Sequence, residues 1–144
     1  MKIAIQNLQK KIPISPKKIK KLVLKVLQLE KIKTPGQLNF YFVNDGKIRK
    51  LNLKYRSTDC ATDVLSFDIS SHAKQIFADI VISVDAAGRN ADEFNTSLQY
   101  ELDLYIIHGM LHLFGYDDAG AKDKRIMQNR QDALLKASKK YAPA

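Results

Sequence analysis

The chain has 144 residues, of which 45% are hydrophobic and 27% are charged. This length and composition predict one globular domain over residues 1–144, and they exclude a mostly disordered chain. No membrane span is expected, because the longest apolar stretch, residues 104–116, is too short and contains two histidines. With a single cysteine and no signal-like N-terminal segment, the expected location is the cytoplasm.

The net charge of +9 is distributed unevenly along the chain. Residues 1–33 carry ten lysines and one glutamate, whereas residues 34–121 have a net charge of −5. Basic ends suit a polyanion such as RNA, and the candidate contacts on one polar helix face are Lys17, Lys18 and Lys21. Charge alone fits a solvated, lysine-rich surface equally well.

Strands and helices alternate in the first part of the chain. Alternating apolar residues predict strands around residues 3–5, 38–42, 64–67 and 77–84. Ser15 and Pro16 are typical of a helix start, and this helix should end before Gly36. Helical spacing also marks residues 46–56.

Beyond residue 84 the pattern is helical. Thr96 and Gln99 form an S/T-x-x-Q capping box, which predicts a helix that runs to about Phe114 and ends at Gly115. A last helix is expected at about residues 119–139. Together these elements predict an α+β (mixed α/β) fold, with one mostly four-stranded sheet packed against about five helices.

Two histidines lie four residues apart in the late, apolar helix. His108 and His112 therefore project from one face, as when a single helix presents two imidazoles to one metal ion. Gly115 can turn the chain back and bring Asp118 within reach of the same ion. Two nitrogens and one carboxylate oxygen leave a fourth position open, as in catalytic zinc sites.

The alternative is a buried helix with two incidental histidines. A zinc peptidase is disfavoured, because its H-E-x-x-H pattern needs a glutamate where this chain has Gly109. Cys60 stands apart from the other candidate ligands in the sequence and is a weak candidate for a fourth ligand.

Residues 108–118 read HGMLHLFGYDD and resemble the H-G-x-L-H-L-x-G-Y-D-H signature of the YbeY family of rRNA-maturation endoribonucleases. Residues 55–67 resemble the family segment Y-R-x-x-D-x-x-T-D-V-L-S-F. Residues 78–80 read ADI where the family usually has Gly-Asp-Ile. The order of the blocks and the chain length also agree, so the resemblance covers the whole domain.

This resemblance implies a metal-dependent, single-strand-specific endoribonuclease. Its substrate would be ribosomal RNA, cut during 3′-end maturation of the small-subunit rRNA and in ribosome quality control. The implied cofactor is zinc, held by His108, His112 and Asp118. The family has a histidine at the last of these positions, and a carboxylate there admits harder ions, so the identity of the metal stays open.

Within this motif, a metal-activated water would be the nucleophile and Arg56 would stabilise the charge on the phosphate. The alternative for Arg56 is a surface ion pair with Asp59 or Asp63. Asp117 would support a ligand histidine or the turn, or would simply cap a helix, and it competes with Asp118 for the third ligand position.

Two other functions compete with the nuclease. One is a non-catalytic RNA-binding factor of ribosome assembly with a structural metal, which the basic ends support. The other is a zincin-like metal hydrolase of another substrate, which the histidine spacing supports.

Overall fold

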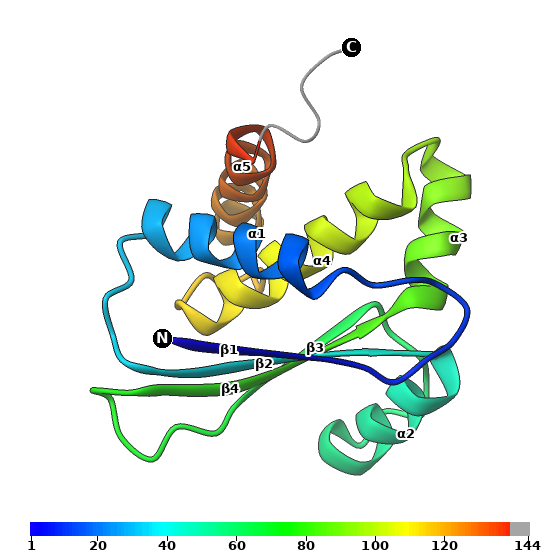
Figure 1. Cartoon of the computed structure of the whole chain (residues 1–144), viewed down its shortest axis with the longest axis horizontal. Helices are drawn as coiled ribbons and strands as arrows, with labels where there is room; N and C mark the ends of the chain where they lie inside the picture. The colour runs from blue at the N-terminus through cyan, green and yellow to red at the C-terminus, as the bar shows by residue number, and fades with distance from the viewer. Residues whose placement is uncertain (139–144) are drawn as a thin grey trace.

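A four-stranded mixed sheet and five helices make up residues 1–138, the part of the chain that the computed structural model describes (Figure 1). The strand order is β1-β2-β4-β3. Strands β1, β2 and β4 run parallel, and β3 is antiparallel to β4. The strands are β1 (Lys2–Asn7), β2 (Gly36–Val43), β3 (Val64–Asp68) and β4 (Ile76–Ser83).

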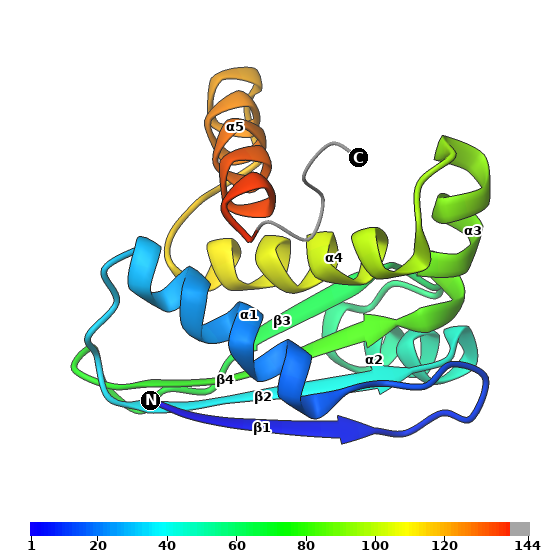
Figure 2. The ribbon, with the colours of Figure 1, turned by 45° about the horizontal axis from the view of Figure 1, so that its top comes forward.

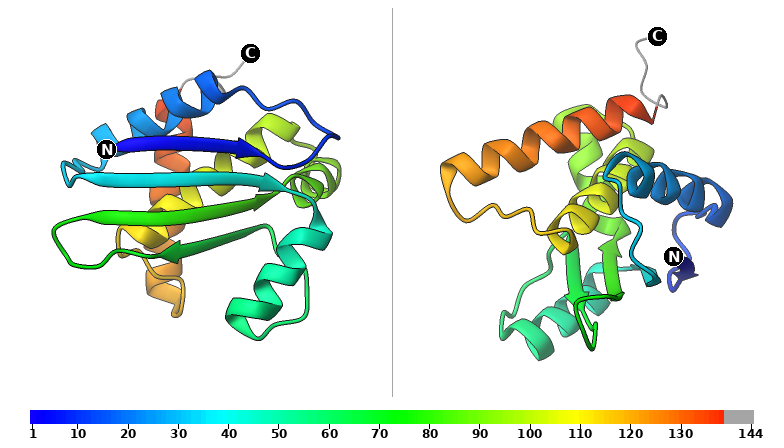
Figure 3. Two further views of the ribbon diagram at one scale, coloured as in Figure 1. Left: turned by 60° about the horizontal axis from the view of Figure 1, so that its bottom comes forward. Right: turned by 90° about the vertical axis from the view of Figure 1, so that its left-hand side faces the viewer.

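The helices are α1 (Pro16–Leu29), α2 (Asp45–Arg56), α3 (Val84–Phe94), α4 (Leu98–Leu113) and α5 (Ala121–Ala137). Figure 2 shows α1 and α4 lying across one face of the sheet, with α5 above α4. Helix α2 lies on the opposite face, beside β3 and β4 (Figure 3). The α+β prediction, with one four-stranded sheet and five helices, is therefore confirmed. None of the described helices is both long and apolar enough to cross a membrane.

Helix α1 follows the sequence prediction closely. Ser15 is its N-cap and accepts a hydrogen bond from the Lys18 backbone N–H at 3.4 Å, and Pro16 is the first helical residue. Its apolar stripe packs into the main core, whereas its lysines are exposed. The stripe consists of Ile19, Leu22, Val23, Val26 and Leu27.

Helix α4 is the central buried helix, and its predicted start was wrong by one residue. Ser97, not Thr96, is the N-cap and accepts from the Tyr100 backbone N–H at 3.0 Å. The capping box is absent because Gln99 now lies at the second helical position, where it donates to Asp103 at 2.7 Å. The Thr96 hydroxyl is buried without a hydrogen-bond partner among residues 1–138. Both Ser and Thr cap helices, and Gln99 three residues after Thr96 made Thr96 the better match to the capping-box pattern.

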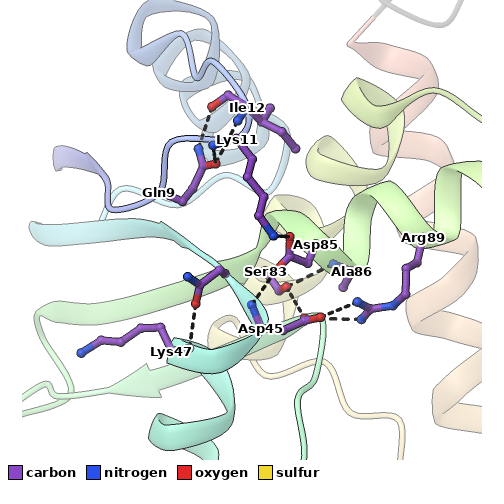
Figure 4. A network of polar contacts seen from close by, with 10 residues as sticks. Gln9, Lys11, Ile12, Asp45, Lys47, Ser83, Asp85, Ala86 and Arg89 are labelled. Carbon is purple, nitrogen blue, oxygen red and sulfur yellow. Dashed lines mark hydrogen bonds and ion pairs between the residues drawn. The ribbon is translucent and has the colours of Figure 1, made fainter.

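A polar network fixes the ends of β2 and β4 (Figure 4). The two carboxylate oxygens of Asp85 accept from Lys11 Nζ and from the Asp45 backbone N–H, each at 2.9 Å. Asp45 in turn accepts from the Ser83 hydroxyl at 2.8 Å and pairs with Arg89. Both acids in this network thus have a basic partner. The network joins the start of α2, the end of β4 and the start of α3.

Candidate metal centre

The three candidate metal ligands come from the end of α4 and the loop after it. His108 and His112 are partly buried on one face of α4, and Asp118 is exposed in the loop. Gly115 has a φ of 98°, a conformation that suits glycine, and there the chain turns away from the helix axis. One ligand atom of each residue lies within 4.8 Å of the other two. The structure therefore brings together the predicted set.

The distances within this set suit one small cation. The Nε2 atoms of His108 and His112 are 3.0 Å apart, and Asp118 Oδ2 is 3.7 Å from His112 Nε2. Zinc–nitrogen bonds of about 2.05 Å in a tetrahedral arrangement place two ligand nitrogens about 3.3 Å apart. The donors thus converge without any large movement, and two nitrogens with one carboxylate oxygen are donors that zinc accepts.

Hydrogen bonds orient both imidazoles. Gln131 of α5 accepts from His108 Nδ1 through its Oε1, which leaves the Nε2 lone pair of His108 facing His112. His112 has a hydrogen bond to the Tyr116 backbone. Burial and the His108 imidazole hold the pKa of His112 below its usual value, against the effect of Asp118. A neutral imidazole is the form that binds a metal.

The loop that carries Asp118 is anchored from two sides. The Tyr116 hydroxyl donates to Glu30 Oε2 at 3.0 Å, and Arg130 of α5 pairs with the same carboxylate. Asp117 accepts from the Ala119 backbone N–H at 3.0 Å. Asp117 therefore stabilises the turn, and the structure gives no direct contact between its side chain and a ligand histidine.

Gly109 lies where α4 packs tightly against the sheet. A Cβ atom at this position would lie 2.9 Å from Ile80 Cγ2 and 3.1 Å from Ser66 Oγ. The Ser66 hydroxyl donates to the Gly109 carbonyl at 3.1 Å. A glutamate side chain at this position would clash with the buried sheet and would point away from the candidate ligands. The general base of the zincin pattern therefore has no space here.

The ligands line a cleft of about 360 Å³ that Arg56 also lines. Arg56 ends α2 and reaches β3, where its Nη2 donates to the Ser66 carbonyl at 2.7 Å. Asp59 pairs with Arg49 at 2.7 Å, and Asp63 accepts from the Val64 backbone N–H at 2.8 Å. The alternative of an Arg56 ion pair with either acid is therefore not what the structure shows.

The remaining predicted residues lie outside the cleft. Lys17, Lys18 and Lys21 are exposed on α1, which covers the β1–β2 side of the sheet (Figure 2), whereas the cleft borders β3 at the other edge. Cys60 is exposed and does not belong to the ligand group found within residues 1–138.

Comparison with known proteins agrees with this geometry. The family profile described as Endoribonuclease YbeY matches residues 4–139. The chain belongs to the YbeY family. Endoribonuclease YbeY from Pelotomaculum thermopropionicum is 34% identical over 94% of this chain and 95% of the relative. The Syntrophus aciditrophicus protein of the same name is 36% identical over 94% of this chain and 88% of the relative.

The fold agrees as well. A solution structure of a Thermotoga maritima protein superimposes with a TM-score of 0.65 at 28% identity. The match covers 94% of this chain and 88% of that one. The sheet and helices of this YbeY-family chain are therefore similar to those of a solved structure.

Three side chains at the centre of this YbeY-family site were not among the sequence candidates. They are Gln131, which holds His108, Ser66, which binds the α4 backbone, and Glu30, which anchors the loop. Ser66 lies in the block that resembles the family, so its position carried a signal. Gln131 and Glu30 are distant in sequence from the ligands, and no local pattern marks them.

Proposed function

We propose that this chain is a metal-dependent endoribonuclease that hydrolyses phosphodiester bonds of single-stranded ribosomal RNA. The observation that carries the proposal is the single cleft that contains three convergent metal donors and the Arg56 guanidinium. Membership of a family described as Endoribonuclease YbeY supports the RNA substrate.

His108, His112 and Asp118 would hold a divalent cation. When bound, this cation would act as a Lewis acid and lower the pKa of a coordinated water towards neutrality. Gln131 would keep His108 in the metal-binding tautomer. Arg56 would donate to the oxygens of the scissile phosphate, because its planar guanidinium fits two oxygens at once and stabilises the charge that grows in the transition state.

We further propose that the metal is zinc and that the substrate is the small-subunit rRNA, cut at its 3′ end in the cytoplasm during maturation and quality control. Two histidine nitrogens with one carboxylate oxygen form a common catalytic zinc set. Because the proposed substrate is the rRNA of the small ribosomal subunit, that subunit would be the partner. The Asp118 carboxylate also admits harder ions such as manganese.

The two competing functions have less support. A zincin-like peptidase lacks both the glutamate and the space for it beside Gly109. A non-catalytic RNA-binding factor would need neither an open ligand position nor an arginine in the same cleft.

Metal content and RNA cleavage test the proposal together. Protein purified without a nickel column should contain about one equivalent of metal by mass spectrometry, and it should cut single-stranded RNA but not duplex RNA. A chelator should stop cleavage. His108→Ala should lose both metal and cleavage, and the matched control His72→Ala, an exposed histidine outside the cleft, should keep both. Cleavage that persists in His108→Ala would assign the activity to a contaminant. Metal and RNA binding without cleavage would support the assembly factor.

A further inference from the structure

A second groove is lined by residues of α2, β2, β3 and β4. Helix α2 lies on the face of the sheet opposite α1 and α4 (Figure 3). The groove has a volume of about 370 Å³, and we call it the open-face groove. Its lining includes Tyr41, Lys47, Leu51, Tyr55, Phe67 and Asp79. None of the metal ligands lines it, so it is a separate hollow from the cleft.

Aromatic rings form one wall of the open-face groove. Tyr55 and Phe67 meet edge to face, with ring centroids 5.5 Å apart. Tyr55 is 57% exposed although it is a large apolar side chain, and Tyr41 enters from β2. One exposed ring and two partly buried rings around a hollow of this size suit a flat aromatic ligand, and unpaired RNA bases stack on such rings.

Most of the remaining lining is apolar (Leu8, Val43, Ile69 and Val81), and Asp79 places one carboxylate among these side chains. Asp79 Oδ1 accepts from Asn39 at 3.0 Å, and Asn39 accepts from Gln37 at 2.6 Å. Among residues 1–138 no donor contacts the second oxygen of Asp79, which is free to accept from a base amino group. This carboxylate repels phosphate, so a nucleotide would enter base first.

The rim is cationic. Lys54 lies over the Tyr55 ring at 5.1 Å, and Lys47 lines the groove directly. No acid pairs with either lysine among the described residues. Cations around an aromatic wall and a single carboxylate match the charge pattern of a nucleotide whose phosphates stay outside while its base lies inside.

Arg56 connects the open-face groove to the metal cleft. Its Cζ lies 5.2 Å from the centroid of the Phe67 ring, in the groove wall, and its Nη2 binds the Ser66 carbonyl beside the cleft. Ser66 and Phe67 are neighbours on β3 and point to opposite faces of the sheet. Since β3 is an edge strand, RNA can pass around it from the cleft to the groove without crossing the sheet.

We propose that the open-face groove binds an unpaired base of the RNA substrate, a few nucleotides from the phosphate held at Arg56. This inference rests on the proposed nuclease function and adds a subsite to it. An apolar protein segment fits less well, because it would bury the Asp79 carboxylate without a donor for its second oxygen. The groove would also explain a preference for single strands, since a paired base cannot enter it.

RNA binding by metal-free protein tests the subsite without cleavage. A short single-stranded RNA with one 2-aminopurine reports stacking by fluorescence quenching, and anisotropy gives the Kd. Tyr55→Ala should weaken binding roughly 5- to 100-fold and remove the quenching. The control Leu53→Ala changes an exposed residue of the same helix that does not line the groove, and it should bind like the wild type. A strand of the same length without bases should bind the wild type and Tyr55→Ala equally.

Asp79→Asn gives a second, independent readout. The wild type should prefer strands rich in cytidine over strands rich in uridine, because only cytosine offers an amino group to the carboxylate. Asp79→Asn should reduce this preference.

Equal affinity of wild type and Tyr55→Ala, together with no discrimination against the base-free strand, would overturn the subsite and leave the groove to a protein partner. Cleavage by the metal-loaded wild type would then still support the nuclease. Conversely, weaker binding by Tyr55→Ala with no cleavage by the loaded wild type would support the subsite and refute the nuclease.

Discussion

Asp85 and Asp118 are carboxylates in two polar clusters of the same chain, and their surroundings differ. Asp85 has a side chain that is 18% exposed, with a lysine and a backbone N–H each 2.9 Å from its oxygens. Asp118 is 50% exposed, and its Oδ2 lies 3.7 Å from His112 Nε2. Both oxygens of the Asp85 carboxylate have partners within the protein, whereas the Asp118 carboxylate is exposed and available to a ligand.

The two clusters also differ in the charges that they bring together. The Asp45–Asp85 network alternates acids with Lys11 and Arg89, so each ion offsets its neighbour (Figure 4). In the cleft, two imidazoles face each other with their Nε2 atoms 3.0 Å apart, and no basic side chain among the described residues offsets the nearby Asp118 as Lys11 and Arg89 offset Asp85 and Asp45. The first network is complete without a ligand, whereas the three donors of the cleft are a group that could hold a metal ion.

The largest effect is expected at Asp118. Asp118→Ala should lose more than about a hundredfold in metal affinity, because loss of an outer hydrogen-bonding group alone costs about 10- to 100-fold. Asp118→Asn should be intermediate. Asp118→His should keep a metal and lower the pH at which activity appears, since a neutral ligand leaves more positive charge on the metal. Full occupancy in Asp118→Ala, with loss in the control Asp117→Ala, would move the ligand back by one residue.

Arg56 tests the other half of the cleft. Arg56→Lys keeps the charge but loses the two-point contact, so cleavage should fall by about a hundredfold at normal metal content. The matched control is Arg49→Lys, on the same helix but paired with Asp59 outside the cleft, and it should cut RNA like the wild type. A wild-type rate in Arg56→Lys would return Arg56 to a purely structural role.

Substitutions of two glycines, one near each cluster, should have opposite effects on the free energy of unfolding. Gly109→Ala should lower the free energy of unfolding by about 1–3 kcal/mol, because the new Cβ would lie 2.9 Å from the buried Ile80. Gly88→Ala, in α3 with no atom within 4 Å, should raise it by about 0.5–1 kcal/mol. Urea denaturation of both variants measures the difference, and equal effects would mean that α4 can shift away from the sheet.

The Asp45–Asp85 network should make the folding stability of the protein depend on pH in the acid range. The Asp45 backbone N–H, followed by Lys11, holds the pKa of Asp85 below its usual value. A lowered folded pKa stabilises the protein at neutral pH, and this contribution is lost as the pH falls below about 4. Asp85→Asn should therefore cost about 1 kcal/mol at pH 7 and progressively less in acid. Asp92→Asn, exposed on the same helix, should change little at any pH. A cost that does not vary with pH would exclude the charge as its cause.

The α1 lysines should have the smallest effect. Lys17, Lys18 and Lys21 are exposed and have no acidic partner within residues 1–138, but they lie away from the cleft. Replacing all three with Gln should reduce the magnitude of the slope of log K against log salt concentration by up to about 2 for single-stranded RNA. The rate at saturating RNA should not change. An unchanged slope would show that these lysines only solvate the surface.

Sequence patterns predicted the parts of the site that depend on local geometry. His108, His112 and Asp118 lie on one helix and its terminal turn, so helical spacing and Gly115 were enough to group them. The fold class followed from the alternation of strands and helices. The start of α4 was placed one residue too early, at Thr96 in place of Ser97. The last helix begins at Ala121 and not at about residue 119, and α3 (Val84–Phe94) was not predicted as a separate helix.

The remaining parts depend on contacts between distant segments. Arg56 reaches the cleft because β3 pairs with β4 and lies beneath α4, which no local pattern encodes. Gln131 meets His108 only because α5 packs against α4. The open-face groove likewise requires Tyr55 of α2 to meet Phe67 of β3.

The contact between Gln131 and His108 also determines when the site is completed during synthesis. Gln131 is close to the C-terminus, and Arg130 beside it pairs with Glu30 to hold the loop that carries Asp118. A nascent chain whose α5 is still inside the ribosomal exit tunnel would lack these two contacts. We therefore expect the proposed metal ligands to be oriented only after α5 has emerged, and a chain truncated before α5 to lack the Gln131 and Arg130 contacts.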